Sequence, residues 1–316
     1  MFQLSSDLVN KMISIDKQLT EKYLNDHFSK NQIRNLLATS FAKFRQMKKL
    51  DRRSMVEFLS HKEIGAVDGS VNQTKGELPF VIYFFQALAK TAGQVECWEH
   101  DIYTPLLIDE LEFDEPQLKM KKKIQSGLEL LVAKRLIETA NVKLLLMDGS
   151  LTHFEIDAQQ EWNELKQLAL EKEVLLVGVT EEVGTKNLCK LAAFHDYGEE
   201  MYDKDLLYGI LEEGEMVYVE GAQLKKNVQT AWLRSSTSPA MIGIDVLNEQ
   251  QQYLDEIADV VFSLTPREGR GIPIVLDMID SEVRVTDKLV EALVEEYLDP
   301  ALKRRLFTPK RTERIY

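Results

Sequence analysis

The chain has 316 residues, of which 44% are hydrophobic and 29% charged, and its net charge is −13. This composition is ordinary for a globular protein and excludes collagen-like, mucin-like and wholly disordered chains. At about 150 residues per domain, the length allows two domains or one enlarged α/β domain with a helical extension.

Cysteine content and hydropathy exclude further classes. Cys97 and Cys189 lie far apart, which excludes a disulfide framework and a four-cysteine zinc site. We therefore expect a reducing compartment and a cytoplasmic location. The sequence has no run of about 18 apolar residues, so no membrane span is expected, and the N-terminus lacks the features of a secretory signal.

The chain divides into three parts by its residue pattern. Residues 1–60 lack glycine and proline and repeat apolar residues at helical spacing, which predicts an N-terminal helical arm. Residues 61–300 mix strand and helix patterns and predict an α/β domain with a mixed sheet flanked by helices. Residues 301–316 form a basic C-terminal tail. Strands are expected at 64–67, within 78–88, and at 144–147, 174–179, 215–220, 229–234, 241–246 and 274–276, and helices at 115–140, 156–171, 186–194, 249–262 and 286–298.

Two of the expected strands are each followed by Asp-Gly-Ser, with the aspartates at Asp68 and Asp148. Two carboxylates at neighbouring strand ends would converge, repel and raise each other's pKa. A hard divalent cation such as Mg²⁺ or Mn²⁺ resolves that repulsion, because it favours oxygen ligands. The alternative is that each Asp-Gly pair only makes a turn after its strand.

Further acidic residues are candidates for the same site. Glu129 lies beside an apolar stripe on the helix before the second Asp-Gly-Ser, where it is either a ligand or a solvated edge residue bonded to Gln125. Asp277 and Asp280 follow the last expected strand. Asp280 could close the site or cap the last helix.

The ordered set of IGAVDGS, the glutamate-bearing helix, LLLMDGSL and the late acidic segment resembles the NurA nucleases over residues 60–300. The resemblance implies an RNase H-like fold, metal-dependent DNA nuclease activity and a homodimer that works with the hexameric DNA-translocating ATPase HerA. Asp68, Glu129 and Asp148 match the family's carboxylates. Where many members carry Ala-His, this chain has Ile279-Asp280, so Asp280 is the expected fourth ligand and Asp277 the fallback.

The resemblance also implies the cofactor and the mechanism. We expect Mn²⁺, or Mg²⁺, as two ions about 3.5–4 Å apart that hydrolyse phosphodiester bonds at DNA ends. Asp68 would hold both ions, Glu129 and Asp148 would flank them, and Asp280 would complete the ligands of the second ion. The sequence contains no GxxxxGK[ST], so a HerA-type partner would supply ATP hydrolysis during end resection, repair or defence.

Other functions stay open at this point. Sugar- and acetate-kinase-like enzymes also place two Asp-Gly-Ser/Thr loops after strands, where the loops bind ATP phosphates. In this chain, the candidate for their adenosine-binding segment is EGRGIP at 268–273. The chain could instead be a catalytically weak adaptor that docks on a hexameric ATPase through residues 1–60. The acidic net charge argues against a nucleic-acid binder, but lysines within 119–123 and the basic tail could follow a phosphate backbone or be solvated surface.

Overall fold

The computed structural model describes residues 5–23, 29–107, 117–197, 201–219, 224–225 and 227–307. These residues form a nine-stranded mixed sheet in the order β1-β7-β8-β9-β6-β5-β2-β3-β4. The strands are β1 Ala42–Gln46, β2 Glu63–Gln73, β3 Tyr83–Thr91, β4 Glu96–Tyr103, β5 Val142–Asp148, β6 Leu175–Thr180, β7 Glu215–Val219, β8 Val228–Leu233 and β9 Ile242–Leu247. β5 runs parallel to both β2 and β6, and the other pairings are antiparallel.

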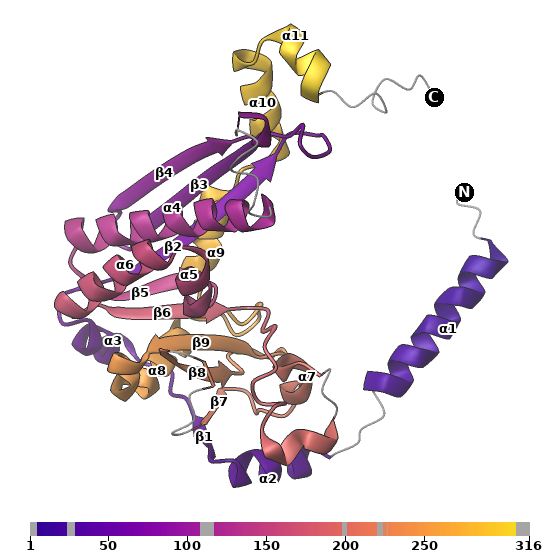
Figure 1. Ribbon diagram of the computed structural model, residues 1–316. Helices are drawn as coiled ribbons and strands as arrows, with labels where there is room; N and C mark the ends of the chain where they lie inside the picture. Colours follow the sequence, from indigo (N-terminus) through magenta and orange to yellow (C-terminus); the bar gives the residue numbers. More distant parts are fainter. Residues whose placement is uncertain are drawn as a thin grey trace.

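Helices cover both faces of this sheet (Figure 1). The α-helices are α1 Ser6–Tyr23, α2 Lys30–Thr39, α3 Arg52–Leu59, α4 Gln117–Thr139, α5 Leu151–Asp157, α6 Gln159–Glu171, α7 Asp203–Leu207, α8 Leu254–Leu264, α9 Ile274–Val283, α10 Asp287–Tyr297 and α11 Pro300–Leu302. Short 3₁₀ segments lie at Pro105–Leu107, Ala192–Tyr197 and Asn248–Tyr253, and a π turn at Lys303–Phe307. Within the described part of the chain, no helix is both long and apolar enough to cross a membrane.

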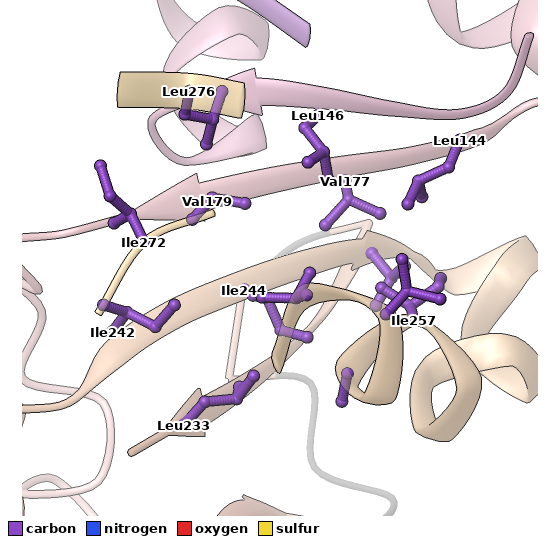
Figure 2. Close-up of a cluster of buried hydrophobic side chains, with 14 of the residues drawn as sticks. Leu144, Leu146, Val177, Val179, Leu233, Ile242, Ile244, Ile257, Ile272 and Leu276 are labelled. Carbon is purple, nitrogen blue, oxygen red and sulfur yellow. The ribbon is translucent and has the colours of Figure 1, made fainter. Parts of the chain in front are cut away.

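Strand β5 shows how the sequence builds two cores. Successive side chains of a strand point to opposite faces. Leu144 and Leu146 therefore belong to one buried cluster with Ile257 of α8 and Leu276 of α9, and Figure 2 shows these side chains together. Leu145 and its neighbours on the other face pack under α4, α5 and α6. A strand buried on both faces reads as a continuous apolar run, and this is the pattern from which it was predicted.

The expected helical arm is only partly helical. α1 and α2 fit the expectation, and Figure 1 shows α1 standing apart from the sheet. Residues 42–46, however, form β1 at the sheet edge, antiparallel to β7. Arg45 on β1 reaches Asp259 of α8 at 2.7 and 2.8 Å. Residues 42–46 form a strand because they pair with β7 and because Arg45 pairs with Asp259. Both partners are distant in the sequence, so the pattern of residues 1–60 alone could not predict this strand.

Two other expected elements are wrong. The strand expected at 274–276 is the start of α9, in which buried Leu276, Ile279 and Val283 recur at helical spacing. A three-residue apolar run does not separate a strand from a buried helix. The helix expected at 186–194 is instead a series of turns leading into a 3₁₀ segment. Of the basic tail, residues 308–316 lie outside the described part of the chain.

Candidate active site

The parallel pair β2 and β5 brings the two Asp-Gly-Ser segments together. Their last paired residues are Val67 and Met147, and Asp68 and Asp148 follow directly on adjacent strands. β5 ends at Asp148, whereas β2 continues to Gln73 against β3 alone. A turn after the strand was expected at the first Asp-Gly-Ser, but these three residues continue the strand. Asp68 lies inside a strand, at the point where its parallel partner stops.

The second Asp-Gly-Ser does turn the chain. Gly149 has φ +100°, a conformation that favours glycine, and its amide donates to the Val179 carbonyl of β6 at 2.8 Å. Ser150 then takes the N-cap position of α5. This turn leaves the Asp148 carboxylate at the carboxyl edge of the strands.

Asp68 and Asp148 lie in a hollow of about 450 Å³ formed by β2, α4, the end of β5, α5 and α9. Its remaining lining comes from Gly69, Lys122, Gln125, Ser126, Glu129, Gly149, Ser150, His153, Phe154, Asp157 and Asp280. The hollow therefore contains the four expected metal ligands, which are Asp68, Glu129, Asp148 and Asp280. It also contains a lysine and a histidine that were not assigned to the site.

Glu129 is buried, so the alternative of a solvated edge residue is wrong. Its side chain packs so closely on Gly69 that a Cβ built there would stand 2.2 Å from Oε1. Gln125, one turn earlier on α4, hydrogen-bonds Glu129 and also donates to the Gly69 carbonyl at 3.2 Å. Glycine at position 69 thus lets the helix carboxylate approach the strand that carries Asp68.

Crowding of carboxylates shifts their ionisation. Burial, and then the negative charges of Asp148 and Asp280, raise the pKa of Asp68 to about 7, although the Gly69 amide donates to it at 2.7 Å. Burial and the Asp68 charge raise the pKa of Glu129 well above its ordinary value. Asp148 is open to solvent on one side, yet the surrounding protein and the Asp280 charge raise its pKa to about 6. Asp68 and Asp148 also share a hydrogen bond.

α9 supplies the last carboxylate from the opposite side of β2. Asp280 lines the hollow and is paired with Arg284, one turn later on the same helix. Asp280 does not cap the last helix, because that position belongs to Thr286, which accepts from the Leu289 amide at 3.2 Å. The fallback residue, Asp277, pairs with Arg270 and does not line the hollow.

The donor set fits a hard cation in its chemistry. Carboxylate oxygens are the ligands that Mg²⁺ and Mn²⁺ prefer, and a divalent charge would offset the burial and the repulsion that raise the three pKa values. In the arrangement described, however, no three acidic, histidine or cysteine side chains of the described residues stand close enough to hold one ion. To bind a cation, the Asp280 carboxylate would have to leave its ion pair with Arg284.

A buried polar network supports the turn after β5. Asp245 of β9 is 1% exposed and accepts from Ser150, from Thr230 at 2.6 Å and from Lys225 at 2.9 Å to each carboxylate oxygen. Lys225 also donates to Ser150 at 3.1 Å. The one signal in the sequence was an aspartate inside the apolar run IGIDVL, which was not assigned a role.

Lys225→Met is expected to destabilise the protein, because it leaves the Asp245 carboxylate buried without a cation. Breaking one side of such a pair costs about 3–5 kcal/mol. In a chain of this size, thermal denaturation should occur roughly 5–10 °C lower. The double variant with Asp245→Asn should recover part of that loss, and an unchanged melting temperature in the single variant would contradict the prediction.

The lysines within residues 119–123, here called the basic run, lie on α4 and take different positions in the structure. Lys122, Gln125, Ser126 and Glu129 recur at helical spacing and line the hollow together. Lys121 instead lies over the ring of Tyr83 at 5.5 Å. The helical spacing from Glu129 would have singled out Lys122 from the sequence.

The chain is similar to known proteins in sequence and in fold. A family model described as the NurA domain matches residues 62–285. Among solved structures, the NurA nuclease from Sulfolobus solfataricus matches with a TM-score of 0.60 and 14% identity, over 92% of this chain and 96% of that chain. The catalytic domain of human endonuclease V matches with a TM-score of 0.41 and 14% identity, over 84% and 94%.

A search of curated proteins finds no match. The family model covers well over half of the chain, and the Sulfolobus structure shares its fold with nearly all of it. The fold class expected from the sequence, an RNase H-like mixed sheet flanked by helices, is confirmed. The chain therefore belongs to the NurA family, and this membership and its fold support a nuclease.

Proposed function

We propose that this protein is a metal-dependent deoxyribonuclease that hydrolyses phosphodiester bonds at DNA ends. The observation that carries the proposal is the convergence of Asp68, Glu129, Asp148 and Asp280 on one hollow, in a chain of the NurA family. Family membership supports DNA as the substrate class.

The four carboxylates would hold two divalent cations, Mn²⁺ or Mg²⁺. Such a pair of ions activates a water, neutralises the phosphate and stabilises the leaving oxygen. Asp68, Glu129 and Asp148 would hold the ions from the strands and from α4, and Asp280 would add a carboxylate from α9. None of the four needs to act as a general base.

Cleavage of linear DNA, end-labelled on either strand, tests this function. With Mn²⁺ or Mg²⁺ the purified protein should shorten the DNA, and EDTA should stop the reaction. Asp68→Ala should lower the rate by about 10³-fold, because metal-ion stabilisation supplies several kcal/mol of the barrier. Metal binding without cleavage under every condition would instead support an adaptor role.

We also propose that the protein acts as a homodimer beside a HerA-type hexameric ATPase. The absence of a P-loop motif from the sequence supports a partner that hydrolyses ATP. Cleavage that becomes faster and ATP-dependent on addition of such an ATPase would support the partnership. Equal rates with and without the ATPase, and no co-elution of the two proteins, would exclude it.

A further inference from the structure

One lysine of the basic run on α4 differs from the others in its position. Both Lys122 and its neighbour Lys123 are exposed, but only Lys122 lines the hollow that holds the four candidate carboxylates. Within the described residues, Lys122 is in none of the ion pairs, and α4 supplies no other lysine to the hollow. Its charge therefore stays available to a ligand that enters the hollow.

The charges of the hollow are unevenly distributed along α4. Glu129 lies next to Asp68, and Lys122 lies seven residues earlier on the same face. Seven residues are about two helical turns, or about 10 Å along the axis. Along α4, the lining of the hollow thus changes from acidic at the strands to cationic at Lys122, with the polar Gln125 and Ser126 between them, while Asp157 of α5 adds one further carboxylate.

A nucleic-acid strand carries one negative charge at every nucleotide, so a bound strand places phosphates on both sides of the one being cleaved. Acidic side chains alone would repel these flanking phosphates. We propose that Lys122 forms a subsite for a backbone phosphate that flanks the scissile phosphate. This inference rests on the proposed nuclease function and names the residue that would hold the substrate strand in register with the carboxylates.

Binding measurements test the subsite without cleavage. In an Asp68→Asn background with Mg²⁺, fluorescence anisotropy of a labelled single strand would be followed across NaCl concentrations. Each phosphate contact contributes about 0.7 to the salt slope for single strands. Lys122→Ala should reduce the slope by about that amount. Lys123→Ala, which removes the same charge from the same helix outside the hollow, should leave the slope nearly unchanged.

Cleavage of chemically modified DNA tests which phosphate is bound. A single methylphosphonate makes one phosphate neutral, and it would be placed in turn at each position near the cleavage site. At one flanking position, the modification should slow the parent protein several-fold and should slow Lys122→Ala little further, because the lost contact is the same. Lys123→Ala should remain as sensitive as the parent.

The outcomes separate this inference from the proposed function. Equal salt slopes for the Lys122 and Lys123 variants, or full sensitivity of Lys122→Ala to every methylphosphonate, would overturn the subsite. A parent protein that binds DNA through Lys122 but never cleaves it would overturn both the nuclease and the flanking subsite, and would leave Lys122 only as a phosphate contact.

Discussion

Asp68→Asn is expected to stabilise the metal-free protein at pH 8 while abolishing its cleavage of DNA. In the folded protein the pKa of Asp68 is raised to about 7 by burial and by its carboxylate neighbours, against about 3.9 in an unfolded chain. At pH 8 the folded state must therefore carry an unfavourable charge. Asparagine keeps the shape and removes that charge, but it supplies a weaker ligand to a cation.

The sign of the pH dependence follows from the same shift. A carboxyl with a raised pKa binds its proton more tightly in the folded state than in the unfolded state. The stability of the metal-free protein should therefore fall as pH rises from about 4 to 7 and stay low above that. Each pKa unit corresponds to about 1.4 kcal/mol, so the effect is at most about 4 kcal/mol, or several degrees in melting temperature.

Thermal denaturation in EDTA between pH 5 and 8 measures this effect. The Asp68→Asn variant should melt higher than the parent at pH 8 and show a flatter pH dependence. Mn²⁺ or Mg²⁺ should stabilise the parent more at pH 8 than at pH 5, and should stabilise the variant less. Asp16→Asn, at an exposed position on α1, serves as the control and should give no gain. A variant that melts below the parent at pH 8 would contradict the prediction.

The sequence predicted Asp68 and Asp148 at the centre of the site because each is marked by the residues next to it in the chain. Two carboxylates, each placed directly after an apolar run, converge when the strands that contain those runs are parallel neighbours, and β2 and β5 are such a pair. The order of the residues, and their resemblance to the NurA nucleases, then added Glu129 and Asp280. Their roles as metal ligands remain predictions.

The elements that the sequence did not predict depend on contacts with residues far away in the chain. Strand β1 exists because β7 offers an edge and Asp259 offers a carboxylate to Arg45. The length of β2 beyond Asp68 depends on pairing with β3, so a local Asp-Gly signal for a turn was overridden. Asp280 reaches the hollow from a helix, not from a strand end, because Leu276, Ile279 and Val283 bury one helical face in the core.

Gly69→Ala should reduce cleavage on the order of 10²-fold through a single added methyl group. The built Cβ stands 2.2 Å from Oε1 of Glu129 and 2.8 Å from its Cγ and Cδ. The obstructed atoms belong to a side chain and not to backbone, so the chain should still fold and Glu129 should be pushed aside. Misplacement of a reacting group by about 1 Å is enough for a loss of this size.

Gly127→Ala is the matched control, because it makes the same substitution on the helix that carries Glu129. A Cβ at position 127 meets nothing within 4 Å. Alanine is favoured over glycine inside a helix by about 1 kcal/mol, so this variant should melt roughly 2–3 °C higher and cleave at the parent rate. Titration with Mn²⁺ would separate the two variants further, since only Gly69→Ala should need more metal for half-maximal cleavage. Equal activity of the Gly69 and Gly127 variants would show that the position of Glu129 does not limit the reaction.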